Sequence, residues 1–273
     1  MNPNECRIVL ATNVGNSRSN QEDNAVFARG RFLSPSDVRA VSDNRQTLCT
    51  GEIQPLYPGI LVCVSDGMGG HASGEIASGA VAGYLSATYQ QMIGAAGLGE
   101  GYIVQHIAAL NRYVCSLSQN NPDYRGMGAT LCGAVSNGGS FYGFSAGDSR
   151  LYHYMNGKLT QLSKDHTEGQ RLLDLGMLSP KECESFPRRK HLYKYVGTGA
   201  ELVADVFKIG QCVPGAKLLM CSDGLCDVIS ESEIESALSS GKDSETVARA
   251  LVDDAVGRSV GKGDNVTLVL VEF

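Results

Sequence analysis

The sequence lacks several features that mark particular classes of protein. It has no tryptophan, only 7% aromatic residues, and no apolar run that approaches the roughly 18 residues of a membrane span. A basic surplus is also absent, since the formal net charge is −6 at pH 7. Nonspecific binding to nucleic acid or to an anionic membrane depends on such a surplus. We therefore expect neither a nucleic-acid partner nor a membrane partner.

Paired cysteines are missing as well. The nine cysteines are scattered and odd in number, and no two of them form a Cys-x-x-Cys pair. Several lie within apolar runs, as Cys63 does between Val62 and Val64. This pattern is typical of buried, reduced thiols in a cytosolic protein. The first residues also lack the pattern of a signal peptide, so a cytoplasmic location is expected.

Strand signals dominate what is present. Asn137-Gly138 and Asn156-Gly157 each separate two apolar runs, which is a strong hairpin signal. Helical patterns come in pairs between runs of strands, and regular alternation of strand and helix is absent. The strands are predicted at 7–11, 24–28, 60–64, 131–136, 140–146, 151–155, 158–162, 202–209, 217–221 and 265–271, the last of them central because it is nearly all apolar. The helices are predicted at 73–92, near 103–117, from 180 onward after a capping box, at 231–238 and at 244–256.

These elements predict an α+β fold: a four-layer αββα sandwich of two antiparallel sheets flanked by helix pairs. The length suits one large domain, and we expect residues 1–273 to form a single catalytic domain. Residues 29–58 are the one long stretch without clear periodicity, and they contain three prolines. They are predicted to form an inserted surface loop or hairpin.

Acidic residues stand beside four predicted strands. The four places are Gln21-Glu22-Asp23-Asn24, Ser65-Asp66-Gly67, Ser222-Asp223-Gly224 and Gly263-Asp264-Asn265. Gathering carboxylates at one end of a core raises their proton affinity and destabilises the fold unless a cation neutralises them. Oxygen ligands without His or Cys favour hard ions such as Mg²⁺ or Mn²⁺. Each Asp-Gly could equally be an ordinary turn, and the sequence alone does not show that the four places converge.

Taken in order, these and other motifs make the chain resemble the protein phosphatase 2C family, in particular its compact bacterial members. The motifs span nearly the whole chain, and the full ordered set is far more specific than any one of them. They are Arg18-Ser19-Asn20-Gln21-Glu22-Asp23, Ser65-Asp66-Gly67-Met68-Gly69-Gly70-His71-Ala72-Ser73-Gly74-Glu75, Met127-Gly128-Ala129-Thr130-Leu131, Ala146-Gly147-Asp148-Ser149-Arg150, Leu159-Thr160-Gln161-Leu162-Ser163-Lys164-Asp165-His166-Thr167, Cys221-Ser222-Asp223-Gly224-Leu225 and Asp264-Asn265-Val266-Thr267.

The resemblance implies a metal-dependent phosphatase acting on phosphoserine and phosphothreonine, in which a metal-bridging hydroxide attacks phosphorus. It implies two Mn²⁺ or Mg²⁺ ions, with a third, weaker site of the kind seen in bacterial members. Asp66 would bridge the two metals and Glu22 would hold metal-bound water, while Asp148 and Asp223 would share the third ion. The alternative for Asp148 is a residue that caps the turn between two strands. The metal ligands implied by the resemblance are Asp23, Asp66, Gly67 through its carbonyl, Asp148, Asp223 and Asp264.

The resemblance also implies residues that handle the substrate. Arg18 matches the phosphate-binding arginine, whose guanidinium fork suits phosphate oxygens. His71 is the candidate general acid, with packing or capping of the following helix as the alternative. Residues 168–196 match a mobile flap, in which Arg188 belongs to a basic run that could contact a phosphopeptide or be a solvated surface. Lys194 stands where the family pattern has arginine, so it keeps the charge and loses the fork.

Three functions follow from this reading. The leading one is a monomeric phosphatase that acts on phosphorylated proteins and opposes a cognate bacterial-type Ser/Thr kinase. The second is a silent adaptor that binds phosphoproteins without turnover, which the intact Asp66, Asp223 and Asp264 argue against. The third is a stress-response phosphatase acting on an anti-sigma-factor antagonist.

Overall fold

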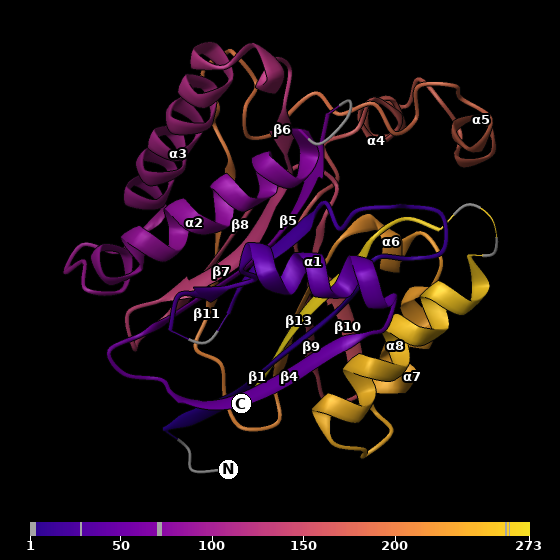
Figure 1. Cartoon of the computed structure of the whole chain (residues 1–273). Coiled ribbons are helices and arrows are strands. Elements are labelled where there is room, and N and C mark those ends of the chain that lie inside the picture. The colour runs from indigo at the N-terminus through magenta and orange to yellow at the C-terminus, as the bar shows by residue number, and fades with distance from the viewer. Residues whose placement is uncertain (1–3, 28, 70–72, 260, 262) are drawn as a thin grey trace.

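Two antiparallel sheets form the centre of the computed structural model, which describes all residues except 1–3, 28, 70–72, 260 and 262 (Figure 1). The first sheet has the order β10 (Lys158–Gln161), β9 (Arg150–Met155), β12 (Lys217–Cys221), β13 (Val266–Glu272), β1 (Glu5–Asn13) and β4 (Leu48–Pro55). The second has the order β11 (Asp205–Gly210), β8 (Phe141–Ala146), β7 (Leu131–Ser136), β5 (Ile60–Met68), β2 (Asp23–Phe27) and β3 (Arg31–Phe32), and β6 (Gly128–Ala129) pairs with the end of β5.

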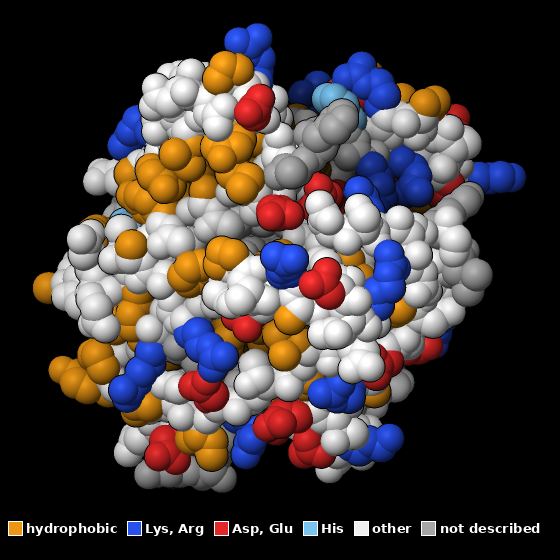
Figure 2. All heavy atoms as spheres, in the orientation of Figure 1, with side chains coloured by type: hydrophobic (Ala, Val, Ile, Leu, Met, Phe, Trp, Pro, Cys, Tyr) orange, Lys and Arg blue, Asp and Glu red, His pale blue; other side chains and the backbone are white. Residues whose placement is uncertain are grey.

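Helix pairs cover the outer faces of the sheets. The first pair, α2 (Ser73–Ile93) and α3 (Glu100–Asn120), covers the second sheet and is followed by a 3₁₀ turn at Pro122–Tyr124. The other pair, α7 (Glu231–Leu238) and α8 (Ser244–Arg258), covers the first sheet. In the orientation of Figure 1, hydrophobic side chains on the surface gather at the upper left, over α2 and α3 (Figure 2). The remaining helices are α1 (Pro35–Asn44), α4 (Glu168–Asp174), α5 (Pro180–Glu184) and α6 (Asp223–Cys226).

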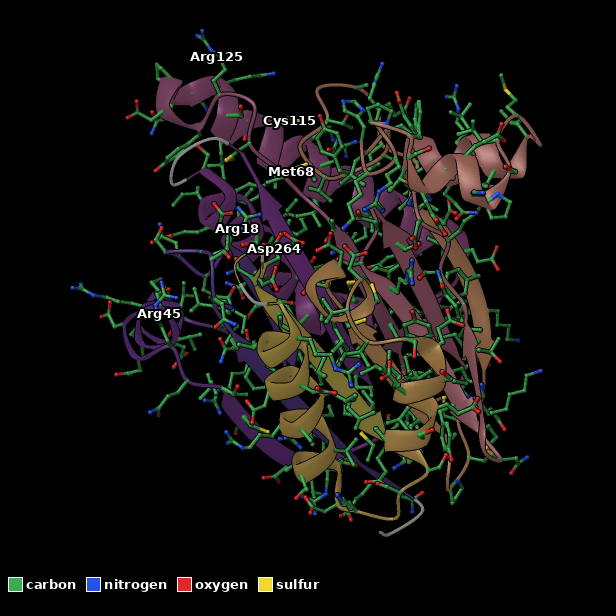
Figure 3. All side chains as sticks on the ribbon, turned by 90° about the vertical axis from the view of Figure 1, so that its right-hand side faces the viewer. Arg18, Arg45, Met68, Cys115, Arg125 and Asp264 are labelled. Atoms are coloured by element: carbon green, nitrogen blue, oxygen red, sulfur yellow. The ribbon has the colours of Figure 1, made fainter. Side chains whose placement is uncertain are left out.

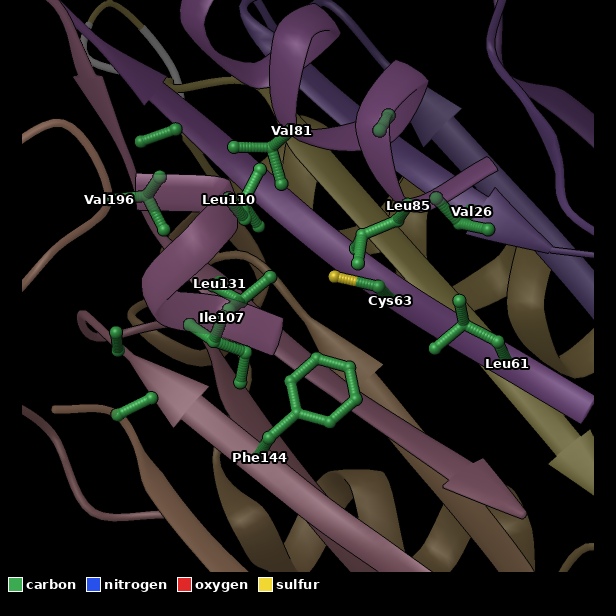
Figure 4. Packing of buried hydrophobic residues seen from close by; sticks show 14 of the residues in the cluster. Val26, Leu61, Cys63, Val81, Leu85, Ile107, Leu110, Leu131, Phe144 and Val196 are labelled. Atoms are coloured by element: carbon green, nitrogen blue, oxygen red, sulfur yellow. The ribbon is translucent and has the colours of Figure 1, made fainter. Parts of the chain in front are cut away.

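Three apolar clusters hold the layers together. Strand β5 contributes side chains to two of them, one on each face of the second sheet. Its alternate side chains Leu61 and Cys63 pack against α2 and α3 (Figure 4), whereas Val62 and Val64 pack against the first sheet. A strand that is covered on both faces reads as a continuous apolar run. The predicted αββα sandwich of two antiparallel sheets is therefore confirmed.

Most predicted elements occur where the sequence placed them. Strand β13 lies between β12 and β1, at the interior position predicted from its apolar composition. In the turn between β9 and β10, Asn156 and Gly157 both have positive φ, as a tight hairpin turn requires. The predicted helix at 180 begins with the predicted capping box at Ser179 and Glu182. Among the described residues, no helix is both long enough and apolar enough to cross a membrane.

The prediction of a loop or hairpin over residues 29–58 was wrong. The segment contains β3, helix α1 and strand β4, and β4 pairs with β1 from Thr12 and Leu48 to Glu5 and Pro55. An edge strand with most residues half-exposed needs no apolar run, and α1 buries only Val41, so neither element produces a clear hydrophobic period. Deleting this segment would remove an edge strand of the first sheet.

Candidate active site

The first half of the site stands where β2 and β5 run side by side. Asp23 and Asp66 are direct partners in this antiparallel pair. The amide of Asp66 donates to Thr130 Oγ1 at 2.9 Å, and the amide of Gly67 donates to the carbonyl of Glu22 at 3.1 Å. A side chain at position 67 would meet a backbone oxygen of α2 at 2.0 Å, so only glycine fits there. Two of the acidic motifs are thus fixed side by side through backbone contacts.

The second half comes from the first sheet and is joined to the first half by side chains. Asp223 opens α6 directly after β12, and Asp264 precedes β13. Ser222 Oγ donates to Asp23 Oδ2 at 2.7 Å. The amide of Glu22 donates to Asn265 Oδ1 at 2.7 Å. The four acidic motifs therefore converge across the sandwich, which the sequence alone could not show.

Asp148 lies in the turn between β8 and β9, in the same region. Its neighbour Ser149 exchanges a 2.6 Å hydrogen bond with Thr130, whose hydroxyl also contacts the amide of Asp66. The buried ring of His166 accepts at Nδ1 from the amide of Gly147 at 3.1 Å. This turn is therefore held from both sides.

The carboxylates disturb one another. Burial and the charges of Asp23, Asp223, Asp264 and Asp148 raise the pKa of Asp66 well above its ordinary value. Burial raises the pKa of Asp23 to about 7 despite its bond to Ser222, and burial followed by the charge of Asp223 raises the pKa of Asp148 to about 7. The pKa of Glu22 is also raised, chiefly by burial. All four pKa values are raised, as expected for carboxyl groups that are crowded together without a neutralising cation.

A buried carboxylate oxygen in this region lacks a partner. Within the part of the chain that the structure describes, Asp23 Oδ1 makes no hydrogen bond. An unpaired buried carboxylate oxygen is unfavourable unless a cation or a proton neutralises it. Together with a donor set made only of oxygens, this atom fits a hard divalent cation.

Basic side chains already contact the outer carboxylates. Arg18 Nη2 lies 2.8 Å from Asp264 Oδ2, and its Nη1 lies 3.5 Å from Glu22 Oε2 (Figure 3). Lys190 Nζ lies 2.7 Å from Asp223 Oδ2. Among the described residues, no group of three His, Cys, Asp or Glu side chains is arranged to enclose an ion. The carboxylates thus lie in one region without enclosing an ion, and Arg18 and Lys190 contact the carboxylates at its edge.

A cavity of about 360 Å³ opens beside these carboxylates. Sequence reasoning did not single out the flap residues His191 and Tyr195 that line it, and neither belongs to an acidic motif. The available sequence signals are that His191 directly follows the basic run and that Tyr195 directly follows Lys194. The lining residues are Asp66, Met68, Thr130, Asp148, Lys190, His191, Leu192, Tyr195 and Asp223.

Two residues predicted to bind substrate lie elsewhere. Lys194 Nζ donates to Asp205 Oδ1 at 2.6 Å, on the strand β11. Arg188 donates to Glu168 at 2.6 Å at the start of α4. Neither lines the cavity. His71, the predicted general acid, lies outside the described residues.

Comparison with known proteins identifies the class. The serine/threonine phosphatase stp of Listeria monocytogenes serotype 4b is 32% identical over 215 residues, which cover 78% of this chain and 84% of that protein. The structure of the Mycobacterium tuberculosis serine/threonine phosphatase PstP/Ppp has a TM-score of 0.76 at 29% identity, covering 98% of this chain and 99% of that one. A Streptococcus agalactiae serine/threonine phosphatase has a TM-score of 0.77 at 25% identity, with 98% and 99% covered. The chain is an enzyme of the protein-serine/threonine phosphatase class.

The family follows from a second comparison. The model of the family described as protein phosphatase 2C matches residues 53–251, well over half of the chain. The chain belongs to the protein phosphatase 2C family.

Proposed function

We propose that the chain is a metal-dependent phosphatase that hydrolyses phosphoserine and phosphothreonine in proteins. The observation that carries the proposal is the meeting of carboxylates from both sheets around the half-buried Asp66, whose pKa is strongly raised by desolvation and by its acidic neighbours. Such an arrangement is stable only with bound protons or bound cations, and the chain keeps it despite the repulsion.

The ions that fit this donor set are Mn²⁺ or Mg²⁺. A related structure, the catalytic domain of PstP with two manganese ions, has a TM-score of 0.73 at 29% identity, with 97% of this chain and 98% of that one covered. When bound, such ions supply a nucleophile from water and neutralise charge on the phosphoryl group. The residues proposed to hold two ions and a weaker third are Asp23, Asp66, Gly67, Asp148, Asp223 and Asp264.

Arg18 is proposed to bind the phosphate. Its guanidinium is about half exposed, and Asp264 and Glu22 hold it beside the carboxylates. A guanidinium in this position has further N–H donors free for phosphate oxygens. Glu22 both orients Arg18 and supplies a carboxylate beside Asp23, where it can accept hydrogen bonds from water. His71 is proposed as the proton donor to the leaving oxygen.

The flap over residues 168–196 is proposed to meet the protein part of the substrate. Arg188 is exposed on it and can contact acidic residues that flank a phosphorylated site. Lys194 would have to leave Asp205 to do the same. A cognate Ser/Thr kinase, a cytoplasmic location and a monomeric state complete the proposal.

The test is hydrolysis of p-nitrophenyl phosphate and of a phosphothreonine peptide by the wild type and by Asp66→Asn, with Mn²⁺ or with a chelator. We expect turnover of both substrates with Mn²⁺ only, and none by the variant. Turnover in the chelator, or full activity of Asp66→Asn, would refute the metal-dependent reaction. Peptide binding without turnover under all conditions would instead indicate a silent adaptor.

A further inference from the structure

Lys190 makes a contact that the phosphatase reaction does not require. Its Nζ donates to Asp223 Oδ2 at 2.7 Å and also contacts Asp227 Oδ2. Asp223 opens α6, and Asp227 lies directly after the end of the same helix. One ammonium group thus connects the flap to the first sheet at a carboxylate that the proposed function gives to metal.

The turn that carries Lys190 is fixed at its base. The amide of Glu168 donates to the carbonyl of His191 at 2.9 Å, and the amide of Gly169 donates to the carbonyl of Arg189 at 3.1 Å. The position of Lys190 is therefore coupled to the start of α4. Loss of the contacts of its ammonium group would remove a restraint that holds this turn of the flap against α6.

The charge of Lys190 acts on both carboxylates that would share the third ion. It lines the 360 Å³ cavity together with Asp148 and Asp223, and it also lines a neighbouring cavity of about 240 Å³. Its charge lowers the pKa of Asp148, in opposition to burial and to Asp223. An ammonium group and a divalent cation repel each other strongly at contact distance, so Asp223 cannot serve both.

We propose that Lys190 is a tethered cation that competes with the third divalent ion for Asp223. This inference rests on the proposed function, because it assumes that Asp148 and Asp223 bind metal. Binding of the ion displaces the ammonium group from Asp223 and leaves it only its contact with Asp227, whose side chain is 39% exposed. Because coupling between two events is reciprocal, metal binding loosens the flap and a loosened flap favours metal binding.

The first experiment is a calorimetric titration of Mn²⁺ into the metal-free full chain. We expect Lys190→Met to bind the weakest ion about tenfold more tightly than the wild type, because the competing charge at contact distance is gone. The matched control is Arg189→Met, which removes the same charge from the next residue along the flap and from the lining of the smaller cavity. Its affinity should change by less than about threefold, since a general field effect is screened by salt.

The second experiment follows the flap itself by hydrogen exchange of residues 168–196. Mn²⁺ should raise exchange of the wild-type flap about fivefold, and metal-free Lys190→Met, which lacks both lysine contacts, should already exchange at least that fast. Equal affinity in Lys190→Met and wild type, or an equal shift in Arg189→Met, overturns the competition. An exchange rate of the flap that Mn²⁺ does not change also overturns the competition. A wild type that binds no Mn²⁺ at all would refute the proposed function as well, so the two failures are distinguishable.

Discussion

The two sides of the active site are built in different ways. The strand-end side holds Asp23 and Asp66 through backbone pairing. Ser222 also donates a buried hydrogen bond to Asp23, and the amide of Asp66 donates a half-buried one to Thr130. The flap side combines a few backbone hydrogen bonds, such as that from Glu168 to His191, with ion pairs between half-exposed or exposed side chains, such as Arg188 with Glu168. Buried hydrogen bonds to charged groups stabilise far more than exposed ion pairs do. The difference indicates that the groups proposed to surround the phosphate are held more rigidly than the exposed ion pairs of the flap, which is proposed to meet a protein substrate.

The largest effect is expected from Asp66→Asn on the rigid side. Turnover with Mn²⁺ should fall about a thousandfold or more, because the central carboxylate is lost. The metal-free variant should nevertheless melt about 2–4 °C higher, since one source of repulsion among buried carboxylates is removed. Steady-state kinetics and thermal melts in chelator check both parts. A variant that is inactive and also less stable would contradict the idea that the cluster is strained without metal.

The next effect concerns the link between the two sheets. Ser222→Ala removes the donor to Asp23 Oδ2 and the acceptor for the amide of Thr267. The free energy of unfolding should fall by about 1–3 kcal/mol, because two buried polar groups lose partners. Urea denaturation with an unchanged m-value would check this.

The pH dependence of stability should have opposite signs on the two sides. Asp23 and Asp148 have a pKa raised to about 7 in the folded protein, against about 4 in an unfolded chain. The folded state then binds more protons, so their contribution is complete below about pH 4 and is lost as pH rises to about 7. In the flap, the hydrogen bond from Lys164 lowers the pKa of Asp174. The contribution of Asp174 to stability is therefore lost as pH falls.

Denaturation of the metal-free protein between about pH 4 and 8 measures the first contribution. Stability should fall as pH rises, and saturating Mn²⁺ should remove the slope because the ions replace the protons. Asp23→Asn is the matched control and should flatten part of the slope. A metal-free protein that becomes more stable toward pH 7 would rule out the raised pKa values.

The smallest effect is expected on the flap. Arg188→Met should change the free energy of unfolding by no more than about 0.5 kcal/mol, because its partner Glu168 forms an exposed pair. Its KM for an acidic phosphopeptide should rise about threefold, with p-nitrophenyl phosphate unaffected. A large loss of stability would show that the flap is as firmly built as the strand ends.

Burial on two faces made the centre of the fold predictable from sequence. Strands β5 and β13 read as apolar runs because layers cover both sides, and the capping box at Ser179 marked α5. The same signal occurs at Ser34, where Pro35 and Asp37 complete a capping box. Hydrophobic periodicity does not mark α1, because this helix buries only one side chain. A cap is a local signal and remains readable where hydrophobic periodicity is absent.

The site was predictable in its members and less so in its contacts. The ordered acidic motifs predicted which carboxylates the structure brings together. The pairing of Lys190 with Asp223 joins residues far apart in sequence, and it depends on how the flap folds back, which no local pattern encodes. The same holds for Lys194, whose charge is directed to Asp205. Long side chains on a folded segment can reach several partners, and only the geometry selects one.

The position of β13 has a consequence for the order of events during synthesis. It pairs with β1 on one side and β12 on the other, so the β1–β4 pair cannot join β12 and β9 until residues 266–272 have left the ribosome. Pairings between such distant segments form slowly. A nascent chain exposed through Arg258 already carries Asp23, Asp66, Asp148 and Asp223, but it has neither Asp264 nor the strand that aligns the two halves. The proposed metal site therefore stays incomplete until Asp264 and β13 have been synthesised.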